Sequence, residues 1–235
     1  MGVGMGSGVR EAVLAAYSGL RHTIYSYMMF GYMMLNDLLN LAAFRVYKIL
    51  EEEGYLTLPI PASPPYDHQQ LKGAISHRHA AVAAGLGELG WNSLLITPKY
   101  GPRVRLVTLL TKAELEADPQ YSGEPLCNRE LCQLACVKAC PVKAIHPEKY
   151  VSVRIGGKTY RYAVVDHWKC RLGLEGLTPG TLGRQPVELE GKASPEAYLK
   201  ALVRADPWQR IELYRGASIC GLCIMHCPVG RFQTG

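Results

Sequence analysis

Hydrophobic residues in the first part of the chain recur at the spacing of a helix. Between residues 35 and 50 they return every three or four positions, at Leu35, Leu38, Leu39, Ala42, Val46, Ile49 and Leu50. Gly54 then stands where a glycine commonly ends a helix. The pattern therefore predicts one amphipathic helix that ends just before Gly54.

Shorter elements follow this helix. The stretch YLTLPIPASPPYDHQQLKG predicts a strand that runs into a proline-rich loop, because its four prolines oppose helix formation. HRHAAVAAGL predicts a second helix, and SLLITP and RVRLVTLLT predict strands. The polar, turn-rich segment KAELEADPQYSGEP interrupts the pattern. We place a boundary near Asp118, which gives two domains, residues 1–118 and 119–235.

Composition indicates a globular protein without a membrane segment. A chain of 235 residues that is 48% hydrophobic can bury one large core or two small ones. The apolar run MMFGYMML contains a glycine and is far shorter than the roughly 20 residues that a spanning helix needs. The N-terminal sequence lacks the basic and apolar regions of an export signal. We expect a cytoplasmic protein.

The eight cysteines all lie in the second predicted domain, between Cys127 and Cys227. The stretch LCNRELCQLACVKACPVKAI holds four of them, and CGLCIMHCPVG holds three. Both runs end in Cys-Pro, as bacterial ferredoxin runs do, and the isolated Cys170 completes two groups of four. Structural zinc sites usually show paired Cys-x-x-Cys motifs, and this chain has one. Two 4Fe-4S clusters are therefore favoured over zinc, and over disulfides or idle thiols.

The Cys-Pro endings also predict which cysteines act together. In two-cluster ferredoxins the cysteine before the proline ligates the cluster of the other run. Applied here, this rule predicts two crossed groups of ligands. Set 1 comprises Cys127, Cys132, Cys136 and Cys227, and set 2 comprises Cys140, Cys170, Cys220 and Cys223.

The net positive charge is weak evidence for an acidic partner. The formal charge of +6 counts every cysteine as neutral, and two clusters with their thiolates lower it to about +2. Nucleic acid is therefore not favoured as a partner, although tRNA stays open.

The motif GLGELG matches a dinucleotide-binding pattern, but it follows a helix pattern and precedes a strand, the reverse of the usual order. It indicates a close-packed glycine turn or a backbone lying against a flat cofactor.

The stretch HRHAAVAAGLGELGWNSLLITPKYGPRVRLVTLLT, followed by two Cys-Pro clusters, resembles the epoxyqueuosine reductase and reductive dehalogenase superfamily. The resemblance extends from about Asn36 to Pro228, and its most specific part is Cys170 ahead of CGLCIMHCP. It implies an α+β chain, with an α/β nitroreductase-like, corrinoid-type domain followed by a bacterial two-cluster ferredoxin-like domain. It also implies cobalamin as a third cofactor. The family's first strand-helix unit has no counterpart, so we expect an N-terminally shortened form.

The resemblance also implies site residues and a function. The residues carried over to line the corrinoid are Gly85, Leu86, Gly87, Gly90, Asn92, Leu94, Thr97, Tyr100 and Arg103. Single electrons from a ferredoxin or flavodoxin would pass through the clusters to cobalamin, which would reduce a small organic substrate. Where tRNA-modifying members carry an acidic proton donor, this chain has Gln70-Leu71-Lys72, which argues against epoxyqueuosine as the substrate. The alternative is an accessory electron-transfer subunit, without cobalamin, that reduces a partner redox protein.

A reductase that attacks a carbon centre needs a proton donor and a cation beside its substrate. Tyr66 and Lys72 of the proline-rich loop are the predicted proton donors, and Arg105 is the predicted cation. We expect their side chains to converge on one cavity bordered by residues 85–90. The run YSYMMFGYMM predicts a core or subunit contact, so a homodimer is also expected.

Overall fold

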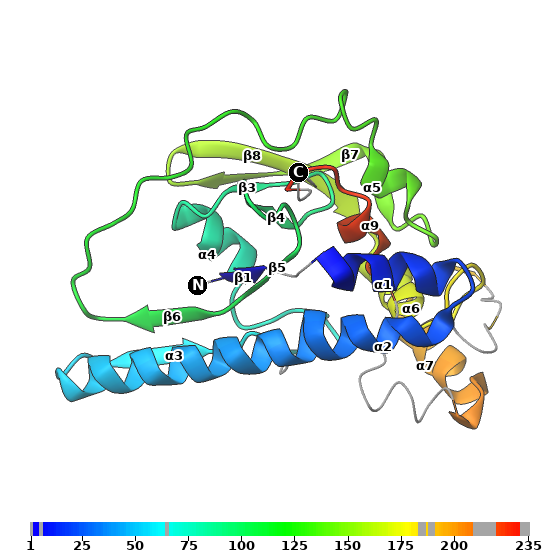
Figure 1. The fold of residues 1–235 in the computed structure, drawn as a ribbon, viewed down its shortest axis with the longest axis horizontal. Helices are drawn as coiled ribbons and strands as arrows, with labels where there is room; N and C mark the ends of the chain where they lie inside the picture. The colour runs from blue at the N-terminus through cyan, green and yellow to red at the C-terminus, as the bar shows by residue number, and fades with distance from the viewer. Residues whose placement is uncertain are drawn as a thin grey trace.

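The computed structural model describes residues 2–4, 7–63, 66–182, 187, 191–208 and 220–230. Its helices and strands confirm the mixed α and β content that the sequence predicts (Figure 1). Within these residues every paired strand is antiparallel, in the two-stranded sheets β1-β5, β2-β6, β3-β4 and β7-β8. The nitroreductase-like arrangement stays a prediction.

In the first half of the chain, helices precede short strands. The order is β1 (Gly2–Gly4), α1 (Ser7–Tyr17), η1 (Arg21–Thr23), α2 (Ile24–Ser26), the π-helix η2 (Tyr27–Met33), α3 (Met34–Glu52), β2 (Thr57–Ile60), α4 (His77–Ala83), β3 (Glu88–Leu89), β4 (Leu95–Ile96), β5 (Val104–Leu106) and β6 (Thr108–Thr111). Because α2, η2 and α3 follow without a break, they form one long helical rod below the strands in Figure 1.

The second half carries the cysteines between short helices and one long hairpin. Its elements are α5 (Ala135–Lys138), β7 (Ile145–Ile155), β8 (Lys158–Val165), α6 (His167–Leu174), α7 (Pro195–Arg204) and α9 (Leu222–Met225). Gly156 and Gly157 join β7 to β8 with φ angles of 52° and 89°. This left-handed pair suits the right-handed twist of a tight hairpin.

The predicted amphipathic helix is confirmed as α3, with its glycine end. Gly54 has a φ of 86°, and the amide of Tyr55 donates to the carbonyl of Leu50 at 2.8 Å. Its buried face was predicted less well. Leu39 and Ile49 both belong to the predicted apolar pattern, but Leu39 is 1% exposed and Ile49 is 60% exposed. The helix packs against β1, β2, β5 and β6, whereas Leu38, Leu41 and Phe44 along it are exposed.

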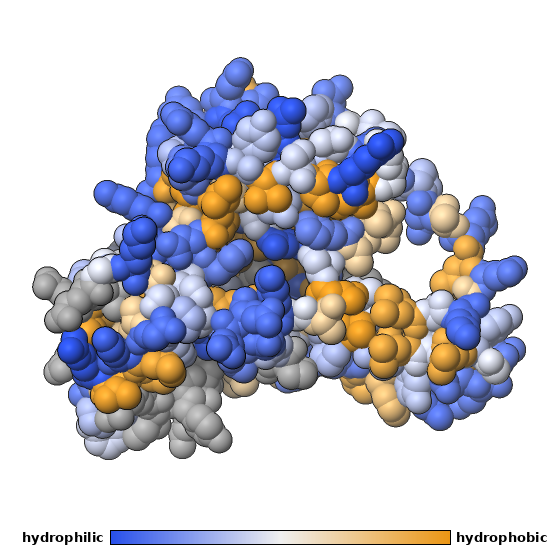
Figure 2. Space-filling view, turned by 180° about the vertical axis from the view of Figure 1, so that it is seen from behind, coloured by the Kyte–Doolittle hydropathy of each residue, from blue (hydrophilic) through white to orange (hydrophobic). Residues whose placement is uncertain are grey.

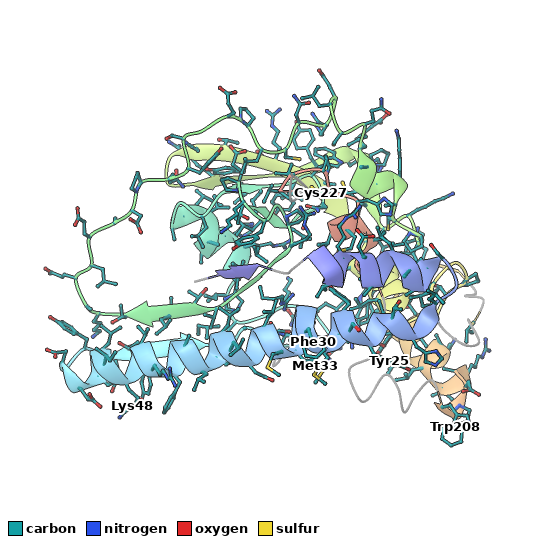
Figure 3. The ribbon with its side chains drawn as sticks, in the orientation of Figure 1. Tyr25, Phe30, Met33, Lys48, Trp208 and Cys227 are labelled. Atoms are coloured by element: carbon teal, nitrogen blue, oxygen red, sulfur yellow. The ribbon has the colours of Figure 1, made fainter. Side chains whose placement is uncertain are left out.

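Several large apolar side chains in the first part of the rod are exposed as well. Phe30 is 60% exposed, and Figure 3 shows Tyr25, Phe30 and Met33 directed away from the rest of the molecule. Tyr27 and Met28 of the same run are buried. The run is therefore partly core, as predicted, and the homodimer stays a prediction.

Two hydrophobic clusters join residues from both sides of the predicted boundary near Asp118. Val13, Ile24 and Met28 pack with Met225 of α9, and the Arg10 side chain donates to the Met225 carbonyl at 3.2 Å. Residues of α4 and β3 pack with Tyr160 of β8 in the same way. The division into two domains stays a prediction. Among the helices of the described residues, none has the length and apolarity needed to cross a membrane.

Candidate metal centre

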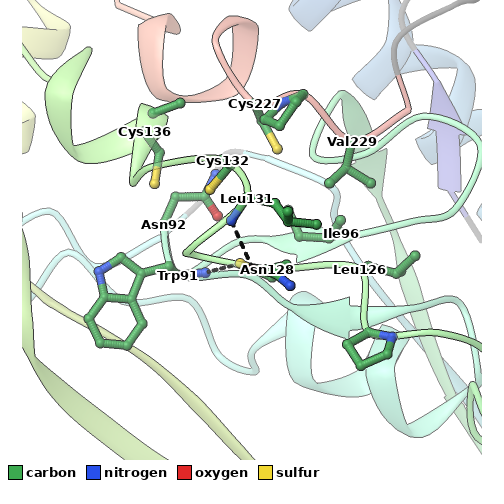
Figure 4. Close-up of a pocket in the computed structure, with 14 residues that line it drawn as sticks. Trp91, Asn92, Ile96, Leu126, Asn128, Leu131, Cys132, Cys136, Cys227 and Val229 are labelled. Carbon is green, nitrogen blue, oxygen red and sulfur yellow. Dashed lines mark hydrogen bonds between the residues drawn. The ribbon is translucent and has the colours of Figure 1, made fainter.

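The four cysteines of set 1 border one cavity of about 340 Å³. Cys127 and Cys132 belong to the loop after the linker, Cys136 to α5, and Cys227 to the turn after α9. In Figure 4 the sulfur atoms of Cys132, Cys136 and Cys227 point toward a shared space. The structure thus brings together cysteines that are up to 100 residues apart in the sequence.

The loop from Cys127 to Cys136 accommodates its long spacing through local turns. The Asn128 side chain accepts hydrogen bonds from the amides of Glu130 and Leu131, both at 3.0 Å. Gln133 and Leu134 then adopt left-handed backbone angles, with φ values of 48° and 54°. The additional residues therefore form a compact turn that leaves Cys132 and Cys136 on the cavity.

The thiols of set 1 influence one another through their charges. Burial, followed by the negative charges of Cys127, Cys132 and Cys227, raises the pKa of the Cys136 thiol to about 12. Burial also raises the pKa of Cys127, against the opposing effects of the Trp91 amide and Arg129. These raised pKa values favour the neutral thiols. For all four to become thiolates together, they need a neighbouring positive charge, which a metal centre supplies.

Arg103 fixes the turn that carries Cys227. Its side chain is 2% exposed and donates to the carbonyls of Ile224 at 3.2 Å, Cys227 at 3.1 Å and Val229. Its charge opposes the effect of burial, which raises the pKa of Cys227. This role was missed from the sequence, because Arg103 lies more than 100 residues away from its partners.

A close backbone contact holds the same turn. Gly101 has a φ of 58°, and a Cβ added there would lie 2.1 Å from the carbonyl oxygen of Val229. Only glycine combines that left-handed angle with such an approach. The segment that ends in Arg103 therefore fixes the position of Cys227 from two sides.

The cysteines of set 2 also act on one another. Desolvation and the charges of Cys220 and Cys140 raise the pKa of Cys170 to about 12. Burial and the charges of Cys220, Cys170 and Cys140 raise the pKa of Cys223 well above its ordinary value. Cys136 of set 1 adds to this effect on Cys223, so the two sets adjoin.

Tyrosines border set 2. Burial, the charge of Cys220 and a hydrogen bond with Cys220 raise the pKa of Tyr17. Burial also raises the pKa of Tyr27, which Arg105 opposes and the charges of Cys223 and Cys220 reinforce. Both phenols therefore remain protonated beside the thiols at neutral pH.

The donor set fits an iron-sulfur cluster. All eight cysteines are free thiols, which leaves no disulfide among them. Thiolates are soft ligands that select iron-sulfur clusters, zinc or copper(I). Among the residues that the structure describes, no three His, Cys, Asp or Glu side chains are grouped closely enough to hold a single metal ion.

Tyr66 lies beside α6, the helix that carries Cys170. The Tyr66 hydroxyl accepts a hydrogen bond from Arg171, and its ring lies 4.4 Å from that of His68. Burial lowers the pKa of His167, and the charges of Arg78 and Lys72 add to this effect. Tyr66 therefore contacts the helix that bears a set 2 cysteine, and Lys72 acts on His167 of the same helix through its charge.

Arg105 has a separate group of partners. Its Nε donates to the buried Asn36 at 2.8 Å, and its guanidinium carbon lies 4.2 Å from the Tyr32 ring centroid. It also influences Tyr27 beside set 2. The convergence of Arg105 with Tyr66 and Lys72 on one cavity stays a prediction.

A polar network around Tyr66 was missed from the sequence. Arg171 forms an ion pair with Glu175 one helical turn away, and the Tyr198 hydroxyl donates to Glu175 at 2.7 Å. Burial raises the pKa of Glu175, and Arg171 opposes this effect. The pair was detectable, because an arginine and a glutamate four positions apart face each other on a helix.

The glycines predicted to line a corrinoid lie in a close-packed turn. A Cβ on Gly85 would be 2.3 Å from the carbonyl oxygen of Pro119, and one on Gly87 would be 2.0 Å from that of Ile96. A Cβ on Gly90 would meet the Ile96 side chain at 2.6 Å. These contacts agree with the packing interpretation of GLGELG.

The other residues predicted to line the corrinoid are divided between internal contacts and partial exposure. The Thr97 hydroxyl bonds to Gly101 and Tyr100, and the Asn92 side chain accepts from the amide of Leu94 at 3.2 Å. Leu86 is 37% exposed. Arg103, also predicted to line the corrinoid, donates instead to carbonyls of the turn that carries Cys227. Most of the polar side chains predicted to meet a corrinoid therefore already have protein partners.

Comparison with known proteins bears on this site. No protein-family model matches the chain. Over 72 residues, or 29% of the chain, it is 50% identical to the tetrachloroethene reductive dehalogenase of Desulfitobacterium hafniense. Over 85 residues, or 35% of the chain, it is 39% identical to the epoxyqueuosine reductase of Gloeobacter violaceus. The predicted resemblance is confirmed.

The similarity covers small parts of these relatives. The matched segment spans 12% of the dehalogenase and 24% of the epoxyqueuosine reductase. A solved structure of epoxyqueuosine reductase from Streptococcus thermophilus superimposes with a TM-score of 0.42 and 20% identity. That superposition covers 84% of this chain and 39% of the other.

Proposed function

We propose that this chain passes single electrons through two 4Fe-4S clusters, one held by set 1 and one by set 2, as part of a reductase. The observation that carries the proposal is the cavity on which Cys127, Cys132 and Cys136 meet the distant Cys227. Cys140 and Cys223 pack against the apolar cluster that contains Cys136, which supports a short path between the sets. The reductase relatives support the general class of chemistry.

When bound, such a cluster accepts and gives up one electron at a time. The chain supplies groups that stabilise the extra negative charge. The amides of Trp91 and Ala144 donate to the sulfur atoms of Cys127 and Cys140, both at 3.2 Å. Hydrogen bonds to ligand sulfur are one of the ways in which a protein adjusts a cluster's reduction potential.

We propose further that set 2 lies on the side where the reduced group is bound. Tyr66 contacts Arg171 of α6, the helix that carries Cys170. Lys72 acts on His167 of that helix through its charge, and Arg105 acts in the same way on Tyr27 beside Cys220. Tyr66 is the candidate proton donor, because the Arg171 cation that donates to its hydroxyl also stabilises the phenolate left behind.

The group that accepts electrons from set 2 is either cobalamin or a partner protein. The resemblance implies cobalamin, but Gly85, Gly87 and Arg103 are occupied by protein contacts and do not fit that group in this structure. We derive no step through it. The packing of this segment favours the second candidate function, in which the chain reduces a partner protein without cobalamin.

Anaerobic reconstitution tests the cluster proposal. We expect about eight iron and eight sulfide per chain, because each 4Fe-4S cluster contains four of each. Reduction should give two interacting S = 1/2 signals by electron paramagnetic resonance. Bound zinc without sulfide would contradict the proposal.

Cobalt analysis separates the two acceptors. Cluster-loaded protein is incubated with hydroxocobalamin and passed over a gel-filtration column. Cobalt that elutes with the protein in a fixed ratio supports a cobalamin reductase. Well-folded, cluster-loaded protein that elutes without cobalt supports reduction of a partner protein.

A further inference from the structure

The β7-β8 hairpin and the loop before it carry an excess of exposed positive charge. Residues 121–165 contain seven lysines and arginines against three glutamates, a net charge of +4. All seven basic side chains are exposed: Arg129, Lys138, Lys143, Lys149, Arg154, Lys158 and Arg161. Figure 2 shows mostly hydrophilic side chains over the upper part of the molecule, where this hairpin lies.

Two of these arginines border a surface cavity that reaches a ligand of set 1. Arg129 and Arg161 line a cavity of about 220 Å³ together with Trp91 and Cys127. Cys127 also lines the larger cavity of set 1, so it lies between the two. The carboxylate of Glu88 lines the smaller cavity as well, and it accepts a hydrogen bond from the Leu126 amide at 2.9 Å.

Arg129 is joined to the sulfur of Cys127 through Trp91. The Arg129 guanidinium carbon lies 4.3 Å from the Trp91 ring centroid, and the Trp91 amide donates to Cys127 at 3.2 Å. Trp91 is 4% exposed, whereas Arg129 is exposed. A molecule bound over Arg129 is therefore separated from a set 1 ligand by Arg129 and Trp91.

We propose that the surface of Arg129, Arg161 and the β7-β8 hairpin, which we call the basic surface, binds a small acidic electron-carrier protein of the flavodoxin or ferredoxin class. The proposal rests on the proposed function, because the electron acceptor is the cluster held by set 1. The reduced carrier loses one electron and is oxidised, set 1 with its iron takes up that electron, and no bond or proton changes place. Complementary charge speeds such encounters and orients them.

Nucleic acid is the competing partner for a basic surface. Sequence-independent binding of single strands combines cations with exposed aromatic rings on which bases stack. Here the Trp91 ring is covered by Arg129, and Arg161 lies 5.0 Å from the Tyr150 ring centroid. The path to Cys127 also favours a partner that supplies electrons, which nucleic acid does not.

The test measures how fast a reduced, acidic flavodoxin transfers electrons to the cluster-loaded protein. Stopped-flow mixing over a range of salt concentrations follows the loss of reduced-flavin absorbance. We expect Arg129→Glu with Arg161→Glu to lower the second-order rate about tenfold at low salt and to weaken its salt dependence. Lys48→Glu is the matched control, because Lys48 is exposed on α3, far from Cys227 in Figure 3.

Two further measurements keep docking separate from cluster assembly. Iron content should be the same in all variants. Because Arg129 lies over Trp91 beside Cys127, reduction by dithionite, which needs no docking surface, is compared in Lys149→Glu with Arg154→Glu and should be unchanged there. If Arg129→Glu with Arg161→Glu loses iron, Lys149→Glu with Arg154→Glu decides the question, because neither residue lines the cavities of Cys127. Failure to assemble clusters in the wild type would instead contradict the proposed function.

Three outcomes would overturn the basic surface as the docking site. The first is an unchanged rate in the charge-reversed variants that retain iron. The second is an equal loss of rate in Lys48→Glu. The third is binding of mixed tRNA, measured by calorimetry under the same conditions, that is tighter than that of oxidised flavodoxin and is lost in the same variants.

Discussion

The two groups of cysteines have different surroundings. Set 1 is flanked by the cations Arg103 and Arg129, and it reaches the surface beside Trp91. Set 2 is flanked by Tyr17 and Tyr27, which belong to or pack against the apolar cluster that joins the N-terminal helices to α9. The Arg171 cation beside Cys170 is paired with the carboxylate of Glu175. Positive charge stabilises the more negative, reduced state of a cluster. We therefore expect the set 1 centre to have the higher reduction potential. Its access to the surface through Cys127 favours it as the first acceptor of external electrons.

The largest effect should come from removing Arg103 beside set 1. Arg103→Ala leaves the partly buried carbonyls of Ile224, Cys227 and Val229 without this donor, which should cost about 2 to 4 kcal/mol of unfolding free energy. Anaerobic urea unfolding measures the change. The exposed Lys48→Ala serves as control. Equal stability of the two variants would contradict the role given to Arg103.

A smaller effect should follow from filling the space at Gly101. Gly101→Ala combines backbone strain with a clash against Val229, so we expect a loss of about 2 kcal/mol and partial loss of iron from set 1. Gly157→Ala is the matched control. Its φ is 89°, and a Cβ there would meet nothing within 4 Å, so strain alone should cost about 1 kcal/mol. Iron loss in both variants, or in neither, would argue against a specific effect on the Cys227 turn.

The smallest effect should appear beside set 2. Tyr17→Phe removes the hydrogen bond to Cys220 and should lower the reduction potential of the set 2 centre while leaving that of set 1 unchanged. A redox titration followed by electron paramagnetic resonance measures both potentials. Tyr25→Phe is the control, because Tyr25 is 43% exposed on α2. A shift in the set 1 signal would mean that the two surroundings are not independent.

Local features of the fold were predictable from the sequence, and contacts between distant segments were not. Helix α3 and its Gly54 end follow from spacing and one glycine, because both depend on neighbouring residues. The exposure of Ile49 could not be predicted, since it depends on which elements cover the helix. The contacts of Gly87 agree with the close-packing interpretation, one of the two that the sequence left open, although its partner Ile96 was not named.

The candidate site shows the same division. Cysteine spacing and the Cys-Pro endings led to set 1, whose four members line one cavity. The partners of Arg103 and Tyr66 were not predictable, because they are contributed by segments more than 100 residues away. Chemical suitability alone suggested Tyr66, Lys72 and Arg105, and it carries no information about which of them meet in space.

The crossed ligand sets are the central claim, and paired cysteine variants test them most directly. Cys140→Ala with Cys170→Ala removes two ligands of set 2 alone, so about four iron per chain should remain after reconstitution. Cys136→Ala with Cys140→Ala removes one ligand from each set, and both clusters should be lost or labile. The contradicting result is the reverse pattern, in which the first pair loses all iron and the second retains one intact cluster.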